Sequence, residues 1–99
     1  MAALHSNQKW TPLGYAQATV TNIAQGFAGL GVAIPTDTVM VEIATEVAIR
    51  YRDDGTPPTA TVGMPLLTSQ QFAYTVPDLT QIQFIAQGSS GKINFNFYK

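Results

Sequence analysis

Apolar and polar residues alternate along much of this chain, and the alternation is clearest in residues 39–44 and 47–52. In both segments every second side chain is apolar, which is the pattern of a β-strand with one buried face. The link between the segments, Thr45 and Glu46, is short enough for a tight turn. The pattern therefore predicts two adjacent antiparallel strands joined as a hairpin.

Other strand candidates are short, rich in β-branched or aromatic residues, and bounded by Gly, Pro or Asp. They cover residues 15–21, 63–67, 72–76, 82–87 and 93–98. A further set of segments is predicted to form loops or turns: residues 88–91, a flexible hairpin loop; residues 35–38, a turn; and residues 26–31, a glycine-broken loop or weak strand.

No stretch sustains a helical period over three turns. We therefore expect an all-β fold, a small antiparallel β-sandwich or barrel-like domain with about six to eight short strands. Residues 13–99 would form this one domain, and residues 1–12 would form an N-terminal arm or edge strand.

The apolar faces of these strands define the expected core. Side chains at alternate positions of a strand point to the same face, so one set of residues should be mostly buried. This set is Val41, Ile43, Ile49, Tyr51, Phe72, Ile82, Phe84, Ile93, Phe95 and Phe97.

The chain of 99 residues is poor in charge. Charged residues make up 11% of it and the net charge is −1, whereas a charged fraction of about 25% is usual. A weakly charged polar surface suits packing against other protein, where charge is costly to desolvate. The few basic residues form no stripe, so we expect no nucleic-acid partner.

Cysteine is absent, which excludes disulfides, thiolate metal sites and cysteine nucleophiles. No apolar run approaches the ~20 residues of a membrane span. Residues 1–5 also lack the basic start and apolar run of a signal peptide. We therefore expect a protein that is made and folded in cytoplasm and has no membrane partner.

The residues that could act in catalysis do not form the pattern of a known catalytic site. His5 is the only histidine, and triad chemistry needs an oriented base held by a third group. Asp53 and Asp54 suggest a calcium site, but the alternating ligand spacing of a calcium loop is absent, so a turn takes precedence. We expect no enzyme activity, no metal and no cofactor.

Residues 49–60 form a strand followed by a sharply punctuated turn. Gly55 is expected to have a positive φ in this turn, because glycine tolerates that conformation. Arg50 and Arg52 share one face of the strand and are interface candidates. The alternative is a cross-strand ion pair with Glu42 or another acid.

The N-terminal segment supplies two more interface candidates, Leu4 and Trp10. Trp10 either anchors the segment on a neighbouring copy or partner, or caps the protein's own sandwich. Together with Tyr15, Tyr74 and Tyr98 it could instead form a sugar-stacking platform, although such aromatics are more often core or interface residues.

The form Ile-Arg-Tyr-x-x-Asp-Gly-Thr-x-Pro-Thr at residues 49–59 resembles the signature of small chitobiase-type C-terminal β-sandwich modules. With Val-Gly-Met-Pro-Leu at residues 62–66 and the strands at 82–86 and 93–98, the chain is more similar to short structural proteins of tailed bacteriophages. The resemblance covers about residues 39–98.

The resemblance implies a non-enzymatic virion structural protein on the capsid surface. Within that class it favours a head decoration or cement protein that binds the major capsid protein, with a homotrimer as the expected assembly. The chitobiase-like signature implies a second class, a carbohydrate-binding or adhesive module of a tail fibre or baseplate.

Overall fold

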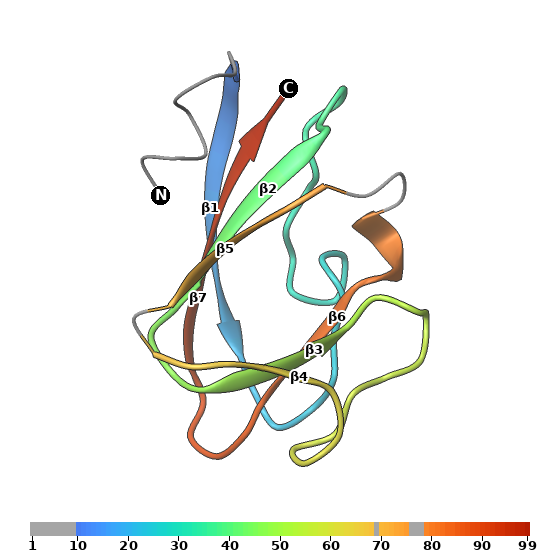
Figure 1. The fold of residues 1–99 in the computed structure, drawn as a ribbon, viewed down its shortest axis with the longest axis vertical. Coiled ribbons are helices and arrows are strands. Elements are labelled where there is room, and N and C mark those ends of the chain that lie inside the picture. Colours follow the sequence, from blue (N-terminus) through green and yellow to red (C-terminus); the bar gives the residue numbers. More distant parts are fainter. Residues whose placement is uncertain (1–9, 69, 76–78) are drawn as a thin grey trace.

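The computed structural model describes residues 10–68, 70–75 and 79–99, which fold into two antiparallel β-sheets packed face to face (Figure 1). In spatial order, the four-stranded sheet contains β1 (Pro12–Val20), β7 (Gly91–Tyr98), β2 (Met40–Thr45) and β5 (Gln71–Tyr74). The three-stranded sheet contains β4 (Met64–Leu66), β3 (Ile49–Arg52) and β6 (Gln83–Ala86). A short 3-10 helix, η1 (Leu79–Gln81), precedes β6.

The expected all-β antiparallel sandwich is thereby confirmed, and the strand number falls within the expected range. The described segments include no helix that is long and apolar enough to cross a membrane.

Both predicted hairpins are wrong, because the strands of each pair lie in different sheets. β2 pairs with β7 and β5, whereas β3 pairs with β4 and β6. Residues 46–48 and 87–90 therefore carry the chain between the sheets (Figure 1). These two crossings are braced by nearby backbone bonds, from Glu46 N–H to the Lys92 carbonyl at 2.9 Å and from Gln87 N–H to the Ala48 carbonyl at 3.0 Å.

Burial explains why the chain crosses instead of forming hairpins. In a hairpin, the apolar faces of the two strands lie side by side and still need a cover. In opposite sheets, the same faces cover each other. Alternation specifies which side chains share a face, but it does not specify which strand lies beside which.

The core is an aromatic cluster between the sheets. Phe84 on β6 and Phe95 on β7 have ring centroids 5.6 Å apart. Phe27 packs against these two rings at 5.6 and 4.8 Å, respectively. It is supplied by residues 26–31, which form a hydrogen-bonded turn and not a strand: the Leu30 N–H donates to the Gly26 carbonyl at 3.0 Å.

Most of the expected core is buried. Eight of the ten predicted residues expose no more than 1% of their surface, and only Tyr51 and Phe72 are half-buried. These two lie where the sandwich ends, on a strand beside the three-residue β4 and on the edge strand β5. Alternation placed them on the correct face but could not show that the cover stops short of them.

Phe84→Ala should strongly destabilise the fold, because the Phe84 ring has no exposed surface. We expect the free energy of unfolding to fall by about 3–5 kcal/mol, a large share of the ~5–15 kcal/mol typical of a domain. Urea unfolding followed by far-UV circular dichroism measures the change. The control is Ile23→Ala, since Ile23 is 67% exposed and should cost within about 0.5 kcal/mol. A Phe84→Ala protein with the parent's midpoint would contradict the packing of β6.

Candidate interaction surface

Aromatic side chains gather where the sandwich opens between β5 and β3–β4. Tyr51 on β3 stacks on Phe72 of β5, with ring centroids 4.8 Å apart and planes inclined by 19°. Tyr74, also on β5, meets both rings edge-on at 6.3 and 5.6 Å. Met64 on β4 lies directly opposite Tyr51 in the sheet register. We call these four residues the aromatic edge.

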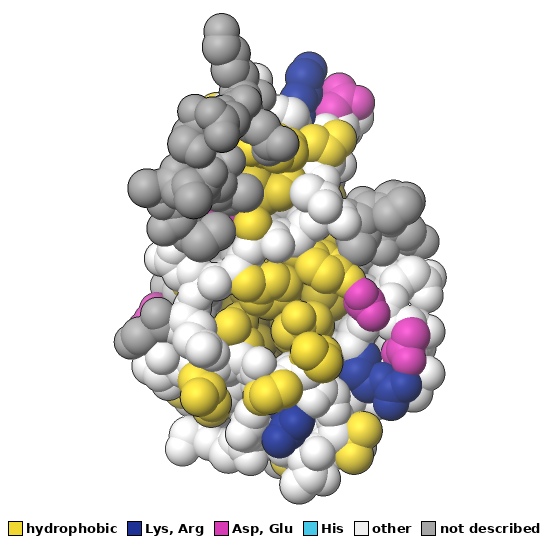
Figure 2. Space-filling view, in the orientation of Figure 1, with side chains coloured by type: hydrophobic (Ala, Val, Ile, Leu, Met, Phe, Trp, Pro, Cys, Tyr) yellow, Lys and Arg dark blue, Asp and Glu magenta, His cyan; other side chains and the backbone are white. Residues whose placement is uncertain are grey.

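The aromatic edge is incompletely covered. Its three rings are half-buried, and Met64 is 59% exposed. Leu67, just beyond β4, is 51% exposed. Figure 2 shows an apolar patch in the middle of the view, in the region where β5 and β3–β4 lie in Figure 1. Partial burial, and secondarily the nearby charge of Asp53, raises the pKa of the Tyr51 hydroxyl above its ordinary value.

Arg50 and Arg52 are both engaged by the loop that follows β3. Arg50 donates from Nε to the Ala60 carbonyl at 3.2 Å and from Nη1 to the Gly63 carbonyl at 2.8 Å. Arg52 donates to both carboxylate oxygens of Asp54, at 3.1 and 2.5 Å. The acid partner of Arg52 is therefore on its own turn and not across the sheet. A contact of either arginine with another protein stays a prediction.

The acidic pair beside Gly55 has the geometry of a turn. Asp54 accepts hydrogen bonds from Arg52 and, at 3.1 Å, from the Thr56 N–H. These two interactions, in that order, lower the pKa of the Asp54 carboxyl. Gly55 has a φ of 80°, as expected. Within the described part of the chain, no three acidic or histidine side chains come together where they could hold a metal ion.

Trp10 lies half-buried just before β1, and its indole Nε1 is buried with no hydrogen-bond partner among the residues that the structure describes. Met40, which alternation places on the outer face of the four-stranded sheet, is also fully buried, opposite Tyr98 in the register. Leu4 falls outside the described residues. Both roles considered for Trp10 therefore stay predictions.

The outer face of the four-stranded sheet is polar. Asn94 Oδ1 accepts from the Tyr15 hydroxyl at 2.6 Å and from Gln17 Nε2 at 3.0 Å. Tyr15 is 61% exposed on this face, whereas Tyr74 packs inward against the core. The four aromatics considered for a single sugar-stacking platform, Trp10 among them, therefore do not share one face.

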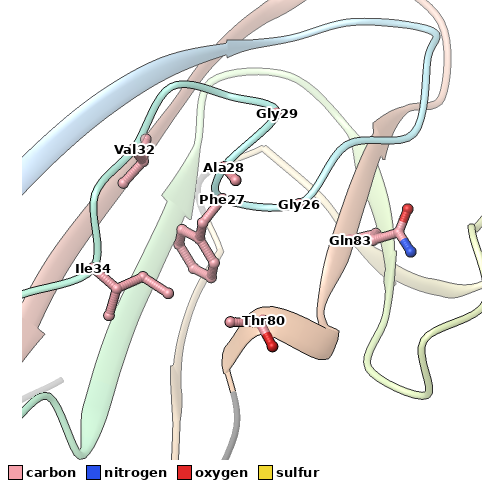
Figure 3. A pocket seen from close by; sticks show the side chains of 8 residues that line it. All are labelled: Gly26, Phe27, Ala28, Gly29, Val32, Ile34, Thr80 and Gln83. Atoms are coloured by element: carbon pink, nitrogen blue, oxygen red, sulfur yellow. The ribbon is translucent and has the colours of Figure 1, made fainter.

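A cavity of about 350 Å³ opens beside η1. Its lining residues are Gly26, Phe27, Ala28, Gly29, Val32, Ile34, Thr80 and Gln83. In Figure 3 the ring of Phe27 points toward Thr80, and Gln83 lies on the side of the cavity opposite to Ile34. None of these lining residues is an acid, a base or a thiol, so the cavity offers shape and apolar contact more than chemistry.

Comparison of the chain with models of known protein families, with curated proteins and with solved structures finds no match. The function must therefore be argued from the residues themselves. Three features can support a function: the incompletely covered aromatic edge, the polar outer face of the four-stranded sheet, and the loop after β3 that binds Arg50 and Arg52.

Gly55→Val should destabilise the turn. A Cβ at this positive φ is strained, and it would lie 2.7 Å from Oε1 of Gln81. We expect the free energy of unfolding to fall by about 1–3 kcal/mol, measured by urea denaturation. Gly88→Val is the matched control, because its Cβ would meet nothing within 4 Å and its φ is not positive. Equal losses in the two variants would contradict a special backbone role for Gly55.

Proposed function

We propose that this chain is a non-enzymatic structural protein that docks onto a larger protein assembly, specifically a decoration or cement protein on the head of a tailed bacteriophage. Its partner is then the major capsid protein, and its place is the outer surface of the virion. The proposal combines two arguments. About residues 39–98 resemble phage structural proteins, and the surface is weakly charged with an apolar aromatic edge.

The aromatic edge is the observation that carries the proposal. A contiguous apolar patch on a small polar protein marks an interaction site. Aromatic residues and Met are enriched at the centres of protein interfaces, and charges are depleted there. Tyr51, Phe72 and Tyr74 are half covered, and Met64 is more than half exposed. A capsid subunit that covered this patch would be stabilised by the binding.

The ring geometry favours a protein over a sugar at this edge. Tyr51 and Phe72 lie nearly parallel at 19°, so each ring covers a face of the other. Tyr74 is inclined to them at 69° and 81°. A sugar stacks on a ring face that is open to solvent, and neighbouring rings must lie in one plane to form a platform. The stacked arrangement suits the irregular apolar contacts of a protein partner.

Purified particles of the phage that encodes the chain test the proposed role. We expect the protein to remain with DNA-filled heads after the tails are removed, detected by mass spectrometry, and an antibody to the chain to label the head surface. Absence from purified particles, or presence in tails alone, would contradict the proposal.

Met64→Gln tests the docking surface. The Met64 side chain is more than half exposed, so the fold should tolerate the change. Binding to heads stripped of the protein should weaken about five- to thirtyfold, as for a contact worth about 1–2 kcal/mol. Co-sedimentation at increasing protein concentration measures it. Ile23→Gln and Val39→Gln are matched controls, because these aliphatic residues are 67% and 49% exposed and are not part of the aromatic edge. Equal weakening by the controls would argue against this surface.

A glycan-binding role is the second candidate, favoured by the outer face of the four-stranded sheet. Tyr15 is 61% exposed there beside the side-chain amides of Gln17 and Asn94. An open ring offers stacking, and amides both donate and accept hydrogen bonds. Saturable binding on a glycan array that Tyr15→Ala abolishes and Ile23→Ala retains would favour this role. An array without saturable binding would count against it.

A further inference from the structure

The edges of the two sheets are protected to very different degrees. β4 is three residues long with Pro65 at its middle, and β5 has four residues. The outer edge of β6 is covered, since Ala86 N–H donates to the Thr21 carbonyl at 2.8 Å and Gln25 exchanges two backbone bonds with Phe84. β1 has nine residues, and no described residue pairs with the edge that faces away from β7.

This outer edge of β1, which is unpaired among the described residues and is termed the free edge, also lacks the usual safeguards against pairing. The strand Pro-Leu-Gly-Tyr-Ala-Gln-Ala-Thr-Val contains no charged residue. Its proline is at its first position, and its irregularity lies between Pro12 and Gly14. Edge strands are normally short, charged, bulged or covered, because a long free edge is a template for another strand.

The bonds made by β7 show which of its residues face β1. Lys99 exchanges two backbone hydrogen bonds with Thr11, on the β1 side. The Lys92 carbonyl accepts from the Glu46 N–H, on the β2 side. Since the direction of backbone bonds alternates along a strand, odd-numbered residues of β7 bond to β1 and even-numbered residues bond to β2.

The register then identifies the free groups of β1. Ala16 lies opposite Phe95, so the even-numbered residues of β1 carry the bonds to β7. The N–H and carbonyl groups of Tyr15, Gln17 and Thr19 consequently point to the free edge. These three residues have their side chains on the polar outer face.

We propose that β1 pairs antiparallel with β1 of a second copy, across a two-fold axis at Gln17. Gln17 then faces Gln17 of the partner copy, and Tyr15 faces Thr19 of the partner copy. The pairing supplies about six backbone hydrogen bonds, two for each of three bonded pairs. It also creates aromatic to β-branched side-chain contacts, which stabilise antiparallel pairs.

Charge opposes a second copy at this edge only weakly. The chain carries a net charge of −1, so two copies repel each other weakly. Lys92, opposite Thr19 in the register, donates from Nζ to Thr19 Oγ1 at 3.0 Å. In the antiparallel pair the two copies of Lys92 lie at opposite ends of the strands. The pairing uses the end of the sheet opposite to β5, so it leaves the aromatic edge free and does not depend on the proposed capsid role.

Sedimentation velocity of the full chain over a wide concentration range tests the pairing. The parent protein should form a dimer. Gln17→Lys and Gln17→Glu each place like charges opposite one another at the axis and should weaken the dimer at least about tenfold. An equimolar mixture of the two variants should dimerise again. Ile23→Lys and Ile23→Glu are the controls and should behave like the parent, because Ile23 is exposed and not part of β1.

Gln17→Pro supplies an independent test. Proline removes an N–H that points to the free edge, and edge strands tolerate proline at such positions. This variant should keep the parent's circular dichroism spectrum and sediment as a monomer. If Gln17→Pro fails to fold, the sedimentation of Gln17→Lys, Gln17→Glu and their mixture decides whether the pairing stands.

A monomeric parent at all concentrations would overturn the proposal, and so would a trimer. A dimer that the Gln17 variants leave intact, or a mixture that fails to restore it, would overturn it equally.

Discussion

The packing of Phe84 against Phe95, with Phe27 inserted beside both, is the interaction on which the structure depends. It joins the two sheets directly, since Phe84 belongs to the three-stranded sheet and Phe95 to the four-stranded one. A chain of 99 residues buries a smaller fraction of its surface than a larger domain does, and without cysteine no disulfide supplements the core. The chain crossings between sheets follow from the need to place apolar faces around these rings.

The same small core explains where the sandwich is incompletely covered. β4, three residues long, does not fully cover Tyr51, Phe72 and Tyr74, and β5, which carries the last two, is the edge strand of its sheet. The aromatic edge is therefore a consequence of short edge strands. At the opposite end of the four-stranded sheet, no described residue pairs with the outer edge of β1. One end therefore offers apolar side chains and the other offers hydrogen bonds, and each suits a different protein partner.

Charge contributes mainly within the molecule. Of five basic residues, Arg50 and Arg52 are committed to the loop of residues 53–63. Arg50 bonds to two carbonyl groups of that loop, and Pro58 within it is buried. Few charges remain to steer an encounter, so recognition by this protein would rest on apolar contact and backbone pairing more than on electrostatics.

The sequence by itself determined the local features. Alternation identified the strands and the inward faces of residues such as Ile43, Phe84 and Phe95, because side-chain direction repeats every two residues. Asp-Gly predicted the positive φ of Gly55, because glycine lacks the Cβ that makes this conformation costly. Both features arise from interactions within a few residues of chain.

Tertiary structure alone decided the pairing of the strands and hence the surfaces. Nothing near β2 in the sequence shows that its neighbours are β7 and β5, because several pairings satisfy the same alternation. The burial of Phe27, the engagement of Arg50 and the incomplete cover of Tyr51 all follow from residues distant in the chain. The candidate surface could therefore not be located from the sequence, since exposure at a sheet edge depends on which strands end there.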